Sequence, residues 1–371
     1  MFNLLFLCYN KKWLKKTKNR IVIYCRLLRY ETGGSSKYLF FGRILRHNMK
    51  QKIVWLSALA GILIFGFIIY KIGPAEIWQY ITKISVYNFL ILVGLRIMYW
   101  LLRTINWKVV LEAYEGKTSL LHLYIARMSG HAVSQLTPTA QVGSEATRIF
   151  MANCSSRKVC FASVIVDKTI EFFAIVFFTI VGVVSIFFRI HLSGKLKAIF
   201  IGGVVISTLL LLFIIFKQKK GLLGWVTDII GKLRIHFKFL EKNRGKIKET
   251  DEHISEFYRS HRGAFLKVFL LYSLLIMLWA AEIHLGLIFI GVADISFVDS
   301  FLITVLGNLA FIFPFIPGSL GIYEATYIGL FALLGRDAGA ALTLVLIRRI
   351  IALLLAGFGL LGMLIPIPAK K

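Results

Sequence analysis

Long apolar segments separated by short polar ones run through most of this chain. Six of them are long enough to cross a hydrocarbon core about 30 Å thick, which takes about 20 residues of helix. These segments are residues 53–72, 88–111, 161–188, 198–216, 265–292 and 340–365. The pattern predicts an all-α, polytopic membrane protein with about six full transmembrane helices.

Two more apolar segments, residues 120–136 and 301–334, are accompanied by proline and glycine breaks. In both regions a proline precedes a Glu-Ala-Thr triplet by the same spacing, as Pro138 with Glu145 and Pro317 with Glu324. Irregular backbone at membrane depth occurs where protein or a water-filled cavity satisfies its polar groups. We therefore expect two re-entrant or broken helices that line a cavity. The alternative for the second region is two ordinary helices that meet at its prolines.

Lysine and arginine gather in the polar segments beside the spans. Residues 1–52 hold thirteen basic residues and one acidic, and residues 217–262 hold twelve basic and six acidic. By the positive-inside rule both segments are cytoplasmic. Six crossings then leave both termini cytoplasmic, in a multi-pass protein of the cell (inner or cytoplasmic) membrane.

This layout makes the two broken helices enter from opposite sides, which is an inverted repeat. Lys168 and Arg348 support the repeat, because each lies in the span after its break at a similar distance from the proline. The alternative is that proline breaks and Glu-Ala pairs coincide by composition.

The domain organisation follows from the same pattern. We expect residues 1–48 to be a basic N-terminal arm, either lying on the membrane or preceding a natural start at Met49. Residues 49–371 form a single membrane domain. Within it, residues 217–262 are a basic cytoplasmic amphipathic insert between the two halves.

Composition and charge exclude several functions. The 371 residues are 58% hydrophobic with a net charge of +27, which fits anionic lipid headgroups better than nucleic acid. The four cysteines and eight histidines show no metal-ligand or disulfide spacing, so we expect no disulfide, no metal and no cofactor. No phosphate-binding loop or nucleophile motif is present.

Ionisable side chains at membrane depth are expensive and are therefore candidate functional residues. Asp167, Lys168 and Glu171 share one helical face. Their alternative role is a structural ion pair between helices.

Glu145 and Arg148 follow the first break. If a helix begins near Gly143, its free amides and Arg148 suit a phosphate, while Glu145 alternatively serves as a first-turn acid.

Two arginines lie deep in other spans. Arg96 and Arg348 need carboxylate or phosphate partners, and neutralisation by protein carboxylates would weaken the case for a headgroup there. The available carboxylates are Asp167, Glu171, Glu282 and Glu324. Near the second break, Gly318 and Gly321 permit a sharp turn before Glu324, whose alternative role is a helix cap.

These stretches resemble a known family. The residues that carry the resemblance are 136–148, 166–171 and 317–325, the last reading Pro-Gly-x-x-Gly-x-x-Glu-Ala. They resemble the flippase-like membrane domain of lysylphosphatidylglycerol synthases over roughly residues 50–365. Members of that family usually carry Glu-Arg where this chain has Asp167-Lys168.

The resemblance implies a lipid translocase that moves a phospholipid or lipid-linked headgroup between leaflets. The partners that we expect are membrane lipids with anionic headgroups, with a separate lipid-modifying enzyme and a homo-oligomer as further candidates, and no nucleic acid. We expect no synthase domain for lysyl transfer in this chain. The alternatives are a membrane subunit supporting a separate lipid aminoacyl- or glycosyltransferase, and a small-solute transporter.

Overall fold

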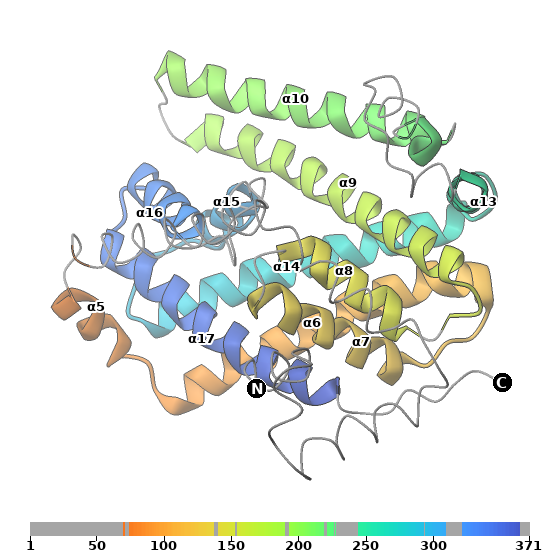
Figure 1. Cartoon of the computed structure of the whole chain (residues 1–371). Coiled ribbons are helices and arrows are strands. Elements are labelled where there is room, and N and C mark those ends of the chain that lie inside the picture. The colour runs from red at the N-terminus through yellow and green to blue at the C-terminus, as the bar shows by residue number, and fades with distance from the viewer. Residues whose placement is uncertain are drawn as a thin grey trace, which may run out of the picture. The chain divides into compact units, whose positions relative to one another are not determined.

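The computed structural model describes residues 70, 74–136, 140–152, 154–189, 193–218, 221–225, 227, 244–292, 294–308 and 321–363 of the chain. All of them belong to one compact unit, Leu56–Lys371. The regular structure within these ranges is helical (Figure 1). Its helices are α5 Pro74–Ile81, α6 Val86–Glu115, α7 Leu120–Leu136, α8 Ala140–Met151, α9 Arg157–Arg189, α10 Gly194–Gln218, α13 Arg244–Ser260, α14 Arg262–Phe289, α15 Phe297–Gly307, α16 Ile322–Leu333 and α17 Ala338–Gly362.

Five helices in the described part of the chain are long and apolar enough to cross a membrane. They lie in α6, α9, α10, α14 and α17 and coincide with five of the six predicted spans. The sixth predicted span, residues 53–72, lies outside the described residues. The prediction of an all-α, polytopic membrane protein is confirmed.

Both proline-interrupted regions contain pairs of short helices. α7 and α8 flank the first break and pack against each other, and α15 and α16 flank the second and are also in contact. α15 and α16 contain 11 and 12 residues, so each is about 17 Å long, roughly half of the hydrocarbon core. The breaks themselves, with Pro138, Pro317 and Gly318, lie outside the described residues.

The described helices include two sets of four that follow the same order along the chain, namely α6 to α9 and α14 to α17. Helices of one set pack against helices of the other. α6 packs against its counterpart α14, whereas α7 packs against α17 and α15 packs against α9. Glycines allow the crossed contacts: a Cβ on Gly359 of α17 would lie 2.1 Å from the carbonyl oxygen of Met128, and one on Gly182 of α9 would lie 2.6 Å from Val305. Gly182 and Gly359 are separated by the same number of residues as Met128 and Val305. The two glycine contacts therefore occupy corresponding positions in the two sets of helices.

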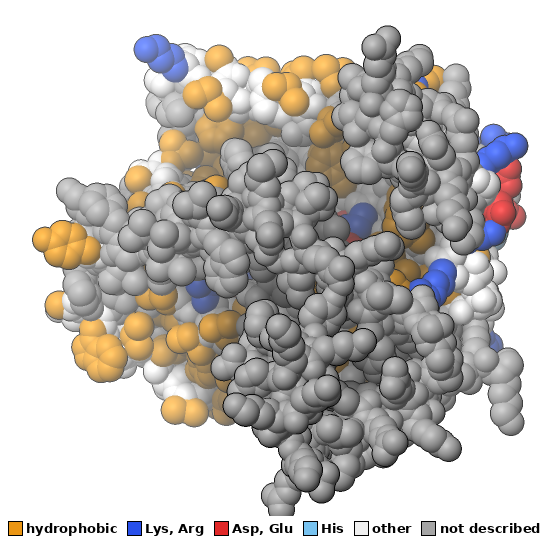
Figure 2. Space-filling view, in the orientation of Figure 1, with side chains coloured by type: hydrophobic (Ala, Val, Ile, Leu, Met, Phe, Trp, Pro, Cys, Tyr) orange, Lys and Arg blue, Asp and Glu red, His pale blue; other side chains and the backbone are white. Residues whose placement is uncertain are grey.

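Apolar side chains cover much of the described surface. On α10, Ile199 and Ile206 are each 67% exposed and Leu209 is 61% exposed. Figure 2 shows hydrophobic side chains spread over the coloured part of one face. Such a surface is stable against lipid chains, which supply no hydrogen-bond partners but are as apolar as these side chains.

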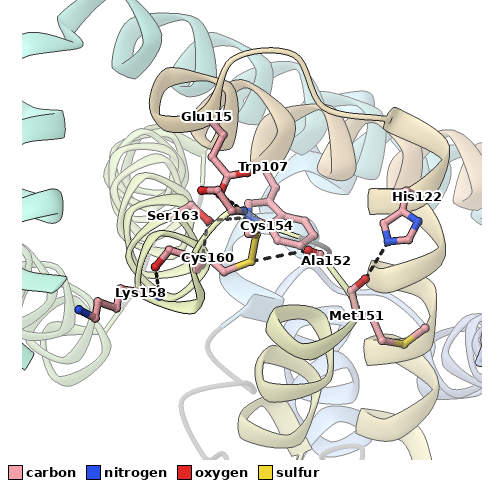
Figure 3. Close-up of a disulfide and its surroundings, with 11 residues drawn as sticks. Trp107, Glu115, His122, Met151, Ala152, Cys154, Lys158, Cys160 and Ser163 are labelled. Carbon is pink, nitrogen blue, oxygen red and sulfur yellow. Dashed lines mark hydrogen bonds between the residues drawn. A yellow bond between two sulfur atoms is a disulfide. The ribbon is translucent and has the colours of Figure 1, made fainter. Parts of the chain in front are cut away.

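The expectation that no disulfide forms is wrong, because Cys154 is joined to Cys160 (Figure 3). The chain reverses between Met151 at the end of α8 and Arg157 at the start of α9. This turn brings the two Cα atoms to 5.9 Å, within the range that a disulfide spans. A separation of six residues has no characteristic motif, so only the turn reveals the pairing.

Removal of this disulfide is expected to destabilise the protein modestly. Closing so short a loop restricts the unfolded chain by roughly 2 kcal/mol in the chain-entropy model. We expect Cys154→Ser to lower the thermal unfolding temperature in detergent, and dithiothreitol to lower that of the wild type but not that of the variant. Equal sensitivity of both proteins to dithiothreitol would contradict the assignment.

Candidate functional site

Asp167 lies at the centre of a buried group of charges. Its side chain is fully buried, and its Oδ2 accepts hydrogen bonds from Arg127 at 3.1 Å and Arg148 at 2.9 Å. Its other oxygen, Oδ1, accepts a hydrogen bond of 2.7 Å from the hydroxyl of Tyr272. One carboxylate thus serves two guanidinium groups.

Two further carboxylates extend this group. Glu145 lies 2.8 Å from Arg148 and 3.3 Å from Lys168, which also contacts Glu171 at 2.9 Å. Glu171 in turn is bonded to Arg103. We call this group the Asp167 cluster, and its members are Arg103, Arg127, Glu145, Arg148, Asp167, Lys168, Glu171 and Tyr272.

Five helices bring the Asp167 cluster together, namely α6, α7, α8, α9 and α14. Trp107 of α6 packs under it: the guanidinium groups of Arg148 and Arg127 lie 4.4 and 5.5 Å from the indole centroid. The indole N–H donates to Ser163 of α9 at 3.1 Å, as drawn in Figure 3. Trp107 therefore fixes the helix-to-helix distance at which both arginines reach Asp167.

The Asp167 cluster has one cation more than it has carboxylates. Arg103, Arg127, Arg148 and Lys168 face three acids, if each group holds its usual charge. Moreover, the buried Nε atoms of Arg103, Arg127 and Arg148 donate no hydrogen bond to any described residue. Unused donors and an excess positive charge favour an anion with several oxygen acceptors.

A second group surrounds Glu282 of α14. Glu282 Oε1 lies 2.5 Å from Arg96 of α6 and 3.7 Å from Arg348 of α17. The guanidinium groups of these arginines lie 5.9 and 5.2 Å from the ring of Trp279. This Glu282 cluster, made of Arg96, Trp279, Glu282 and Arg348, again holds one excess cation. Among the described contacts, the indole N–H of Trp279 has no acceptor.

Glu324 has the capping role considered for it and also pairs with an arginine. It is fully buried in the first turn of α16, where its Oε2 accepts a 2.7 Å hydrogen bond from the backbone N–H of Gly321. Gly321 has a φ of 81°, a conformation that glycine adopts without strain. The other oxygen accepts a 2.5 Å hydrogen bond from Arg349 of α17. Glu324 therefore caps α16 and ties it to α17.

The structure brings most of the predicted site residues into these groups but corrects one helix start. α8 begins at Ala140, so Gly143 and Glu145 lie beyond its first turn, and Glu145 is no first-turn acid. The backbone continues regularly before Gly143 because Ala140, Gln141 and Val142 are already helical. The first amides of α8 therefore lie about one turn before Gly143.

Sequence reasoning missed Arg127, Tyr272 and Trp279 as members of the site. Arg127 lies in α7, and the sequence signal that could have found it is a charged residue within the apolar segment 120–136. Tyr272 and Trp279 read as ordinary members of an apolar span. Glu282, in contrast, was among the carboxylates considered as partners for Arg96 and Arg348.

The members of the Asp167 cluster differ in exposure: Asp167 and Arg148 are buried, whereas the side chain of Lys168 is 30% exposed. A cavity of about 230 Å³ lies elsewhere, lined by Arg189, Asp299, Leu302, Leu333 and Leu334. Arg189 is about 33 Å along α9 from Asp167. A hydrated hollow between the two breaks stays a prediction.

Comparison with known proteins identifies the family. The family model described as the lysylphosphatidylglycerol synthase TM region matches residues 54–359. The chain belongs to this family. A UPF0104 membrane protein of Methanothermobacter thermautotrophicus is 26% identical to it over 318 residues, which are 82% of this chain and 92% of that protein. Another, from Pyrococcus horikoshii, is 26% identical over 269 residues, which are 68% of this chain and 78% of that protein. No solved structure matches the chain.

Both clusters lie within the part of the chain that the lysylphosphatidylglycerol synthase TM-region model matches. The resemblance seen in the sequence therefore covers the helices that carry the buried charges. The family and the helical spans together make this a multi-pass membrane protein.

Proposed function

We propose that this family member is a lipid translocase, which moves a phosphate-bearing lipid headgroup between the leaflets of the cell membrane, with both termini cytoplasmic. The observation that carries the proposal is the pair of buried clusters with one excess cation each. A buried ion pair contributes little net stability compared with apolar residues of the same size. Charge kept at this depth is therefore better explained by a ligand.

A phosphodiester headgroup fits the charge of each cluster. It carries one negative charge, which would neutralise the excess cation. Its oxygens can accept from the unused Nε atoms of Arg103, Arg127 and Arg148, and guanidinium groups bind phosphate in a bidentate manner. At the other cluster, the indole N–H of Trp279 is available to the same kind of acceptor.

An inverted repeat would place the two clusters in opposite halves of the membrane. Its support is the crosswise packing of α7 with α17 and of α15 with α9, with equally spaced glycine contacts. Asp167 and Arg348 also lie at the same position, about 15 Å from the start of α9 and of α17 respectively. If these helices start on opposite sides of the membrane, each cluster serves one leaflet.

The energy source follows from the residues present. The chain carries no ATP-binding motif, so we propose passive or ion-coupled transport. Glu324, Glu145 and Asp167 are the acids proposed to couple an ion or a proton, because each is tied to a cation that a phosphate could draw away.

Reconstitution into liposomes tests this proposal. We expect the wild type to accelerate translocation of a fluorescent anionic phospholipid, and Glu324→Gln to slow it by at least about tenfold, since a charge-assisted hydrogen bond to Arg349 is weakened. Asp299→Asn is the matched acid-to-amide control, because Asp299 pairs with the exposed Arg189 outside both clusters.

Two outcomes would overturn the proposal. One is that folded wild-type protein leaves lipid translocation at the rate of empty liposomes. The other is that it carries labelled inorganic phosphate or glycerol phosphate into the vesicles while lipids stay in place, which would identify a small-solute transporter.

A further inference from the structure

One tyrosine side chain contacts the cations of both clusters. Arg96, Tyr99 and Arg103 lie three and four residues apart on one face of α6. Arg103 Nη1 donates a hydrogen bond of 3.3 Å to the hydroxyl of Tyr99. The guanidinium of Arg96 lies 5.2 Å from the centroid of the same ring. Arg103 belongs to the Asp167 cluster and Arg96 to the Glu282 cluster, so Tyr99 joins the two.

Trp279 supports the ring of Tyr99 from α14. The two rings meet edge to face, with centroids 5.6 Å apart. Trp279 also contacts both arginines of the Glu282 cluster. Tyr99 is only 5% exposed, and this packing holds its hydroxyl on the side of Arg103.

The distance between the clusters raises the free-energy cost of moving a phosphate from one to the other, and Tyr99 can lower this cost. Arg96 and Arg103 are seven residues apart, so their backbones lie about 10 Å apart along α6. A phosphate that has left one arginine before reaching the other would be an unpaired anion at membrane depth, which costs several kcal/mol. A hydroxyl between them lowers this cost, because it can donate a hydrogen bond to a phosphate oxygen.

The hydroxyl of Tyr99 is free to do so. It accepts from Arg103, and its own proton is donated to no acceptor among the described residues. Accepting from a guanidinium also polarises the O–H bond, which makes it a better donor to an anion.

We propose that Tyr99 is a positioning residue that passes a phosphodiester headgroup between Arg103 and Arg96. This inference rests on the proposed lipid translocation and adds a defined intermediate position to it. The lipid headgroup binds first at one cluster, then between Arg103, the Tyr99 hydroxyl and Arg96, and then at the other cluster.

Tyr99→Phe tests this step because it removes the hydroxyl and keeps the ring against Trp279. In liposomes with increasing mole fractions of fluorescent anionic phospholipid, we expect the maximal translocation rate to fall about tenfold, as loss of one hydrogen bond to a charged group predicts. The mole fraction that gives half the maximal rate should stay within about twofold, because both clusters keep their arginines. The unfolding temperature should stay close to that of the wild type.

Tyr114→Phe is the matched control on the same helix. Its hydroxyl donates to the carbonyl of His253 at 3.0 Å, outside both clusters, so its loss should leave the maximal rate unchanged. A Tyr99→Phe variant as fast as the wild type, or a Tyr114→Phe variant equally slow, would overturn the inference and leave lipid translocation standing. Wild-type protein that carries only free phosphate, or nothing, would overturn both proposals.

Discussion

Asp167→Asn is expected to destabilise the folded protein by about 3–5 kcal/mol, the range for removing one partner of a buried ion pair. The substitution preserves size and one acceptor oxygen but removes the charge. Arg127 and Arg148 would then share no carboxylate at Oδ2, and both are almost fully buried. The measurement is the unfolding midpoint in detergent, followed by tryptophan fluorescence.

Two further variants separate charge from shape in this prediction. Arg127→Met in the Asp167→Asn background removes one uncompensated cation and should restore at least about 1 kcal/mol, as groups in direct contact are usually coupled. Asp299→Asn, at a partly exposed ion pair, should cost less than about 1 kcal/mol. If Asp167→Asn costs no more than Asp299→Asn, the Asp167 cluster is not the electrostatic centre described here.

Gly359→Ala is expected to have the second largest effect. The new Cβ would lie 2.1 Å from the carbonyl oxygen of Met128 and 2.7 Å from its carbon. These are backbone atoms, so no side-chain rotation relieves the clash, and α17 must move away from α7. Overpacking of this kind costs about 1–3 kcal/mol, or more where the backbone must shift.

The same movement should impair transport. Arg127 directly precedes Met128 on α7, and Arg348 lies three turns before Gly359 on α17. Separating these helices therefore shifts one arginine of each cluster. We expect lower lipid translocation per folded Gly359→Ala protein, measured in the same liposomes.

Gly357→Ala is the control for this variant. A Cβ on Gly357 would meet nothing within 4 Å, so this change should be neutral or stabilising by up to about 1 kcal/mol through helix propensity. Gly182→Ala tests the corresponding contact: its Cβ would lie 2.6 Å from a methyl group of Val305, and Val305→Ala should relieve it. Equal stability of Gly359→Ala and Gly357→Ala would contradict the close approach of α7 and α17.

The sequence predicts the transmembrane spans and the charged residues within them, but it predicts only some of the residues of the site. Arg96, Arg348 and Asp167 stood out because a charge in an apolar segment is visible without a structure. Glu282 was one of several acids that could have paired with them. Arg127 was harder to predict, because it lies in a segment too short for a full crossing.

The sequence by itself determined where the membrane is crossed and where the crossings are interrupted. The free energy of moving a helix into lipid is summed over its own residues, and a proline in the interior of a helical segment interrupts or kinks it. Only the tertiary structure decided that one carboxylate serves Arg96 and Arg348 and another serves Arg127 and Arg148. Partners such as Arg96 and Glu282, 186 residues apart, meet because α6 packs against α14. That packing depends on how several helix surfaces fit together, which no local segment encodes.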